Sequence, residues 1–257
     1  MPKLTCIAHR GGHLDHTHRS HNSHSIHHSN SQSNTTTQTP ENSLAAIRHS
    51  LSIGADVIEI DVWQIEGELL VTHDRRLGRQ LPGQGRLLDQ PLQDLLKLKL
   101  SNGEAIPKLA DILNLCLDHC QINIEIKGQN TVTTLISALK IFSSQHNISL
   151  DHVIVSSFDH CQLQLLQKQL PQVKRGVLLA NKPLDLCASI CTLNPYSIHF
   201  HIGIVDRELV EDAHNQQLLV WVYTANHADE WQQLIDLGVD GIFTDTPGNL
   251  LKFLGNQ

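Results

Sequence analysis

Eight stretches of the chain carry the short apolar or alternating pattern that is typical of β-strands. These predicted strands span residues 3–9, 57–62, 122–127, 153–157, 175–179, 197–200, 219–223 and 241–244. Between most of them, apolar residues return every three or four positions, which predicts amphipathic helices. The predicted helices span residues 44–53, 92–98, 109–117, 132–142, 162–169, 207–215, 229–237 and 249–254.

Strands that alternate with helices predict a parallel sheet, and eight such units predict a (β/α)8 barrel of the TIM type. An open doubly wound sheet fits less well, because the glycine-rich phosphate-binding fingerprint is missing after the first strand. The length of 257 residues and the hydrophobic content of 40% suit one large core. We therefore expect residues 1–257 to form a single barrel domain, with a small hairpin turned by Gly67 after the second strand.

Residues 13–39, just after the first predicted strand, differ in composition from the rest of the chain. They are almost wholly His, Ser, Asn, Thr and Gln, with Leu14 and Ile26 as the sizeable apolar residues. Such a segment cannot bury enough apolar surface to offset the entropy that it would lose on ordering. The composition therefore predicts a disordered, histidine-rich insertion in the loop after the first strand.

Charge and composition exclude some classes of function. A net charge of −7 with scattered basic residues argues against a nucleic-acid scaffold. No apolar run approaches the roughly 20 residues of a membrane span, and the N-terminus lacks the pattern of a signal peptide. The six cysteines lie in apolar surroundings without a C-x-x-C pair, so we expect buried thiols in a reducing cytosol. A cytoplasmic protein without stable membrane insertion is expected, and its oligomeric state is left open.

Two carboxylates, Glu59 and Asp61, interrupt the most apolar predicted strand. Side chains two residues apart on a strand point to the same side, so these acids converge about 6–7 Å apart. Two buried anions repel each other and lose hydration, which favours a cation between them, and a divalent metal prefers such oxygen ligands. A solvent-facing edge strand is the alternative, but the intervening residues of 57–62 are too apolar for it.

A second strand repeats this arrangement with Glu125 and Lys127. Glu125 could supply a third oxygen ligand, and Lys127 would hold an anion close to the metal; alone, the two could equally form a structural ion pair. Active sites of such barrels lie at the C-terminal ends of the strands. Polar or aromatic residues fall at or near these ends at His9, Glu59, Asp61, Glu125, Lys127, Ser157, Trp221 and Asp245.

Eight short motifs follow one another from the first predicted strand to the last. They are His9–Gly11, Pro40–Ser43, Gly54–Val62, His73–Asp74, Ile106–Leu109, Ile124–Lys127, Ser156–Asp159 and Gly241–Asp245. Together they resemble the glycerophosphodiester phosphodiesterase family, barrel enzymes that cleave glycerophosphodiesters to sn-glycerol 3-phosphate and an alcohol. The resemblance implies a small-molecule substrate and a divalent metal, Mg2+ or Ca2+.

The resemblance also implies a role for each matching residue. The implied metal ligands are Glu59, Asp61 and Glu125; the acid–base pair is His9 and His73; the phosphate contacts are Arg10 and Lys127; and Trp221 packs against the glycerol. Histidine suits acid–base work near neutral pH. The assignment of acid and base between the two histidines, and the formation of a cyclic phosphate, stay open.

Some residues have a second interpretation. His9 could be a core histidine bonded to a backbone carbonyl, and Trp221 a plain core residue. Glu41 acts at the site, or, as we favour, supports the start of the next helix and pairs with Arg10. Asp245 either supports the site or, as we favour, caps the last helix.

The chain departs from the family pattern at the insertion, which separates the His-Arg-Gly motif from Pro-Glu-Asn, and at a shortened hairpin before His73. The Arg-Thr of the family stands here as Arg79-Gln80. A lysophospholipase D acting on lipids is one alternative function, although it would need an apolar lip. A metal-handling protein is another, because histidines in this density bind Zn2+, Ni2+ or Cu2+. Its ligands would be His13, His16, His18, His21, His24, His27 and His28.

Overall fold

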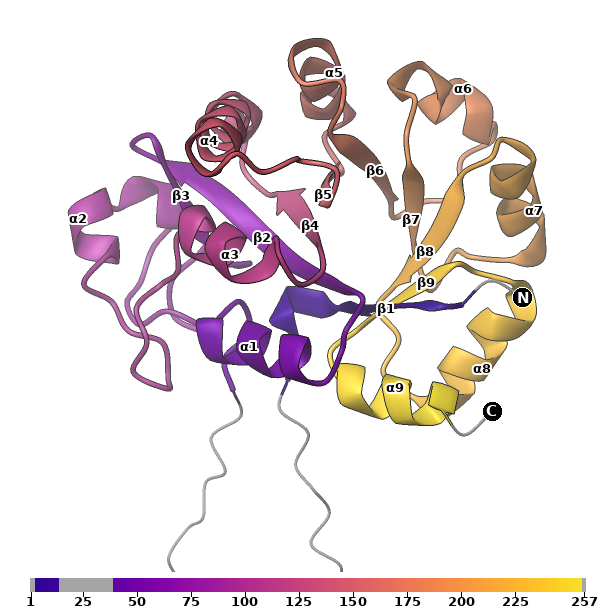
Figure 1. Ribbon diagram of the computed structural model, residues 1–257, viewed down its shortest axis with the longest axis horizontal. Coiled ribbons are helices and arrows are strands. Elements are labelled where there is room, and N and C mark those ends of the chain that lie inside the picture. The colour runs from indigo at the N-terminus through magenta and orange to yellow at the C-terminus, as the bar shows by residue number, and fades with distance from the viewer. Residues whose placement is uncertain (1–2, 14–38, 256–257) are drawn as a thin grey trace, which may run out of the picture.

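The computed structural model describes residues 3–13 and 39–255. In this part of the chain nine strands form one sheet, and all neighbours pair in parallel except β3, which is antiparallel to β2. The strands are β1 Thr5–Ala8, β2 Val57–Ile65, β3 Glu68–Val71, β4 Gln121–Ile126, β5 Val153–Ser157, β6 Lys174–Leu179, β7 Ser197–His201, β8 Leu219–Tyr223 and β9 Gly241–Thr244. Because β1 pairs with both β9 and β2, the eight parallel strands close into a barrel (Figure 1).

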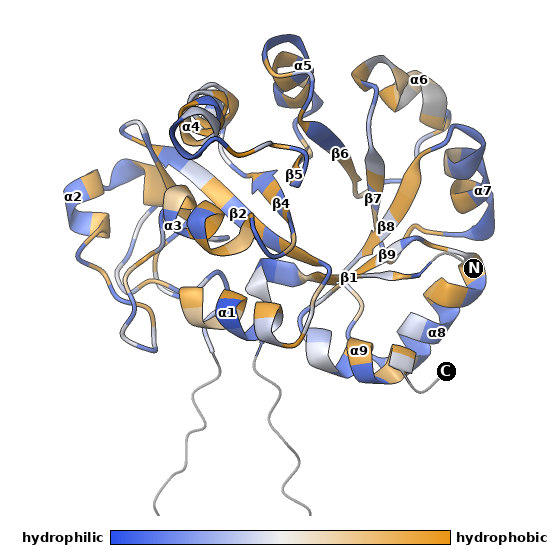
Figure 2. Ribbon diagram, viewed as in Figure 1, coloured by the Kyte–Doolittle hydropathy of each residue, from blue (hydrophilic) through white to orange (hydrophobic). Residues whose placement is uncertain are grey.

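Helices surround this barrel on its outside (Figure 1). They are α1 Leu44–Ser52, α2 Leu92–Leu95, α3 Leu109–Cys116, α4 Thr131–His146, α5 His160–Gln169, α6 Leu186–Ile190, α7 Arg207–Asn215, α8 Ala228–Leu237 and α9 Pro247–Gly255. Three short 3-10 helices lie at His9–Gly11, Leu87–Asp89 and Cys191–Leu193. The helices carry apolar and polar residues on different sides, as expected for a layer between a core and water (Figure 2).

The strands separate two buried regions, because successive side chains point to opposite faces of a strand. Residues such as Ile60 and Ile124 belong to the large core that also contains Leu135 of α4. A smaller cluster fills the barrel interior with Ile7, Val57, Ile154, Trp221 and Phe243. The interior is small, so polar residues near the strand ends are held close together.

The predicted barrel is confirmed, and the strands β5, β8 and β9 have the predicted bounds. Helix α6 was not predicted, because its five residues are too short for a helical period to be visible. The predicted helix 92–98 ends at Leu95, and α4 extends beyond its predicted span on both sides. The hairpin turned by Gly67 is present as β2 and β3.

The predicted disordered insertion falls mainly on residues 14–38, which lie outside the described residues, so it stays a prediction. The cysteine prediction is corrected in part. Cys6 and Cys116 are buried thiols as expected, but Cys161 is exposed and Cys191 is disulfide-bonded. Among the described residues, no helix combines the length and the apolar composition that crossing a membrane requires.

Candidate active site

Three carboxylates meet at the C-terminal end of the barrel. Glu59 and Asp61 point inward from β2, and Glu125 points inward from β4, where it is the register partner of Asp61. One ligand oxygen of each lies within 4.8 Å of the other two. Glu59 and Asp61 are each only 1% exposed, and β2 lies between β1 and β4. The solvent-facing edge strand considered above is therefore excluded, and the predicted convergence is present.

Two cations lie against these acids. The Lys127 Nζ is 2.7 Å from an oxygen of Glu125 and 3.3 Å from an oxygen of Asp61. The Arg10 Nε is 3.7 Å from Asp61. Burial would raise the pKa of Asp61, but Lys127, His73 and Arg10 hold it below its ordinary value. Burial and the neighbouring charge of Asp61 raise the pKa of Glu59 to about 8.

These residues fit a divalent cation. One oxygen of Glu59 accepts a hydrogen bond of 2.6 Å from the backbone N–H of Arg10. The other, Oε1, is buried and has no hydrogen-bond partner among the described residues. A buried carboxylate oxygen without a partner is costly, and a hard cation would satisfy it. Glu59, Asp61 and Glu125 could therefore hold one metal ion.

His9 stands directly after β1 and is held by Asp245, which stands directly after β9. The two strands are neighbours, and the His9 Nδ1 lies 2.7 Å from Oδ1 of Asp245. Asn226 donates from Nδ2 to Oδ2 of Asp245 at 2.7 Å and accepts from its backbone N–H at 2.8 Å. Burial would lower the pKa of His9, but its hydrogen bond to Asp245 and the charge of Glu59 raise it above its ordinary value.

The contact between His9 and Asp245 settles two alternatives. The ring of His9 binds a carboxylate, so the interpretation as a core histidine bonded to a backbone carbonyl is not supported. Both side-chain oxygens of Asp245 are used by His9 and Asn226. The favoured prediction that Asp245 caps the last helix is therefore wrong, because its carboxylate turns toward the site.

His73 follows β3 and has a similar partner. Its Nδ1 lies 3.1 Å from Oδ1 of Asp74, and Arg79 donates to the two oxygens of Asp74 at 2.8 and 2.7 Å. Arg79 also donates to Glu41, which accepts from Arg10 at 3.1 Å, so Glu41 pairs with Arg10 as predicted. Burial lowers the pKa of His73 below its ordinary value.

A second group of possible metal ligands is formed by Glu41, His73 and Asp74. Here the positive charge is already supplied, because the guanidinium of Arg79 binds both carboxylates. The shortened hairpin thus still places His73 at the site, where its charge acts on the pKa of Asp61.

Trp221 lies lower in the barrel than predicted. Its register partner on β9 is Gly241, the first residue of that strand. Its side chain is 1% exposed and its ring stacks on His199 with 5.0 Å between centroids. The predicted contact between Trp221 and the glycerol of a substrate does not agree with this burial. Tyr223, two residues later on the same face of β8, stands at the strand end instead.

Two further site residues were missed by sequence reasoning. Asn42 is fully buried and binds Asp61 twice, donating from Nδ2 to Oδ2 at 2.9 Å and accepting from the backbone N–H at 3.2 Å. Asn226, which holds Asp245, follows β8 in a loop. Asn42 lies in the Pro40–Ser43 motif, which could have pointed to it. Tyr223 could have been found by counting two residues beyond Trp221 on the same face of the strand. No sequence signal pointed to Asn226.

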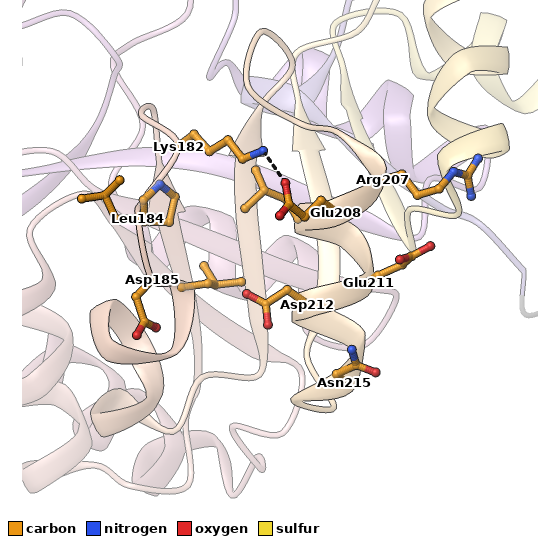
Figure 3. A pocket seen from close by; sticks show the side chains of 11 residues that line it. Lys182, Leu184, Asp185, Arg207, Glu208, Glu211, Asp212 and Asn215 are labelled. Carbon is orange, nitrogen blue, oxygen red and sulfur yellow. Dashed lines mark hydrogen bonds and ion pairs between the residues drawn. The ribbon is translucent and has the colours of Figure 1, made fainter.

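A cavity of about 720 Å³ lies away from these residues, between the segment 182–186 and α7 (Figure 3). Lys182, one of its lining residues, forms ion pairs with Asp206 at 2.6 Å and with Glu208 at 3.1 Å. None of the predicted site residues lines this cavity. The candidate site is therefore the cluster at the strand ends, not the larger hollow.

Comparison with known proteins identifies the family of the chain. The model of the glycerophosphoryl diester phosphodiesterase family matches residues 9–249. A glycerophosphodiester phosphodiesterase of Caldanaerobacter subterraneus is 31% identical over 84% of this chain and 92% of its own, and one of Bacillus altitudinis is 30% identical over 83% and 92%. An Oleispira antarctica phosphodiesterase, solved in complex with the product sn-glycerol-3-phosphate, shares the fold with a TM-score of 0.79 at 23% identity, over 98% of this chain and 96% of that one. The chain therefore belongs to the glycerophosphoryl diester phosphodiesterase family.

Proposed function

We propose that this protein hydrolyses glycerophosphodiesters to sn-glycerol 3-phosphate and an alcohol, with a divalent cation held by Glu59, Asp61 and Glu125. The observation that carries the proposal is the meeting of these three acids within 4.8 Å at the strand ends that also present His9. Membership of the family and the product complex of the Oleispira antarctica relative support the substrate class.

The charges at the site suit a phosphodiester, which is a stable anion. Lys127 and Arg10 are the cations beside the carboxylates, and each is partly buried, with 16% and 20% of its side chain exposed. A positive group in a partly buried site attracts a phosphate more strongly than one in water. A divalent ion bound by the three acids would neutralise charge that develops on the phosphoryl oxygens. Mg2+ and Ca2+ both prefer such oxygen ligands.

The two histidines would move the protons. The carboxylates of Asp245 and Asp74 lie against Nδ1 of His9 and His73, which leaves Nε2 of each ring for the substrate. One ring takes a proton from the nucleophile, and the other gives a proton to the leaving alcohol oxygen. The carboxylate partner fixes which nitrogen of each ring carries the hydrogen. The predicted cytoplasmic location stays a prediction.

The test separates metal binding from proton transfer. Glu59→Gln, Asp61→Asn and Glu125→Gln each remove one charged ligand oxygen, so each should weaken the binding of Mg2+ or Ca2+ measured by calorimetry. Raising the metal concentration should restore part of their activity, measured as release of glycerol 3-phosphate. His9→Ala and His73→Ala should lower kcat by at least about 100-fold without such rescue.

Glu68→Gln serves as the control, because it also removes a carboxylate but one that pairs with Lys108 outside the site. It should leave metal affinity and turnover near those of the wild type. Equal losses in all five site variants that no metal concentration restores would contradict the assignment of the acids as metal ligands.

A further inference from the structure

Three rings gather at the open end of the barrel, beside the candidate active site. Phe158 follows β5 directly and is 47% exposed. Its ring meets Tyr223 of β8 at 6.0 Å between centroids and an interplanar angle of 84°. His201, the last residue of β7, meets the same Tyr223 ring at 5.6 Å and 78°. Phe158 and His201 therefore both stand nearly perpendicular to Tyr223, and we call the three the aromatic corner.

Tyr223 is fixed in place by its own hydroxyl. The hydroxyl donates to the carbonyl oxygen of Leu179 at 3.1 Å, so the side chain reaches from β8 across β7 to the end of β6. Because the hydroxyl is engaged in this hydrogen bond, Tyr223 would contact a ligand through its aromatic ring. Aromatic faces carry partial negative charge, and rings that meet at right angles form the walls of sites that bind organic cations.

The aromatic corner borders the site of the proposed chemistry through one of its three rings, Phe158. Phe158 lines a cavity of about 370 Å³ together with Glu125 and Lys127, two of the residues that surround the proposed phosphate position. Asp159 lines the same cavity, and the charge of Glu125 acts on the pKa of Tyr223.

We infer that the aromatic corner binds the alcohol part of the substrate and selects an alcohol that carries a quaternary ammonium group. A quaternary ammonium has no N–H to donate, so ring faces and nearby carboxylates recognise it better than hydrogen-bonding groups do. A polyhydroxy alcohol would instead lose hydration against the exposed face of Phe158 without a gain in hydrogen bonds. The inference rests on the proposed function, since it names the substrate within that reaction.

The experiment compares two substrates of one shape and different charge. These are glycerophosphocholine and its 3,3-dimethylbutyl analogue, in which a carbon atom replaces the charged nitrogen. A cation–π contact of about 0.5–2 kcal/mol corresponds to a preference for the charged substrate of about 2- to 30-fold in kcat/KM. Phe158→Leu keeps an apolar side chain without a ring, and it should bring this preference close to one. Phe158→Ala should do the same and lower kcat/KM for both substrates.

Leu88→Ala is the matched control, because Leu88 is 53% exposed in the short helix at Leu87–Asp89, away from the aromatic corner. It should keep the full preference of the wild type. Equal kcat/KM for the two substrates in the wild type, or an unchanged preference in Phe158→Leu, would overturn the inference while leaving the phosphodiesterase activity standing. Absence of hydrolysis of both substrates, with Mg2+ or Ca2+ supplied, would instead contradict the proposed function.

Discussion

At the scale of single residues, the two histidines of the site share one arrangement, in which a carboxylate binds Nδ1 of the ring. The partner of His73 is the next residue, Asp74, whereas the partner of His9 comes from the opposite end of the chain. Asp245 is further tied to Asn226 through its side chain and its backbone. His9 is therefore oriented by Asp245, and Asn226 in turn holds Asp245 in place.

Asp245→Asn tests this orientation. The amide keeps the size of the side chain but removes the charge, and it can present N–H instead of oxygen to Nδ1 of His9, which favours the wrong tautomer. We expect kcat to fall at least about tenfold with KM nearly unchanged. Steady-state kinetics on glycerophosphocholine measures this split, and metal affinity should stay at the wild-type value. A rise in KM with normal kcat would mean that Asp245 acts on substrate binding instead.

At the scale of elements, the strands of the barrel interior fit together through glycines placed opposite rings. Gly176 of β6 faces the ring of His199 on β7, and Gly241 of β9 faces the ring of Trp221 on β8. A Cβ at these two positions would lie 2.5 and 2.7 Å from the nearest ring atom. The rings fill the interior below the carboxylates, so the packing of neighbouring strands supports the floor of the site.

Gly176→Ala should destabilise the protein by about 1–3 kcal/mol, because the added methyl group overpacks a closed interior. The free energy of unfolding in urea measures the loss. Gly255→Ala is the control, since a Cβ there meets no atom within 4 Å. The double variant Gly176→Ala/His199→Ala removes the ring that the new methyl group would meet. Its loss of stability should therefore be smaller than the sum of the losses in the two single variants. A Gly176→Ala protein as stable as the wild type would show that the strands can shift apart freely.

At the scale of the whole molecule, the barrel interior holds polar groups that must stay uncharged. His199 is fully buried, and burial lowers its pKa to about 3. Its Nε2 lies 2.8 Å from the hydroxyl of Ser197, and its Nδ1 has no partner among the described residues. Folding therefore requires the neutral imidazole, whereas the unfolded chain takes up a proton near the ordinary value of 6.5.

This requirement predicts a loss of stability in acid. Because the folded pKa of His199 is depressed, its contribution is complete above pH 6.5 and is lost as the pH falls toward 3. The loss is about 1.4 kcal/mol per pH unit in this range. His199→Phe removes the titrating group and keeps a ring, so between pH 6.5 and 4.5 it should lose about 2–3 kcal/mol less than the wild type. Urea unfolding of both proteins at several pH values measures the difference. The carboxylates that both proteins share contribute equally to the two curves and cancel in the difference. Parallel curves of unfolding free energy against pH would refute the assignment of this acid sensitivity to His199.

What followed from the sequence by itself depended on local chain geometry. The alternation of strand and helix patterns predicted the barrel, because the periods of two and of about 3.6 residues are properties of the backbone. Glu59 and Asp61 were predicted to converge for the same reason, and the parallel register of β2 and β4 then adds Glu125. The strand ends placed His9 and Lys127 at one end of the barrel, since strand ends meet there. The roles of Arg10 and His73 followed from the resemblance to the family.

Only the tertiary structure decided which strands become neighbours when the barrel closes and how far from the mouth of the barrel each side chain lies. Asp245 turned out to hold His9, a contact between residues 236 positions apart that exists because β1 and β9 become neighbours. Trp221 and Tyr223 share one face of β8, and the register against β9 placed the first in the floor and the second at the mouth. Periodicity tells which face of a strand a side chain occupies, but the position of the neighbouring strands decides which residues it meets.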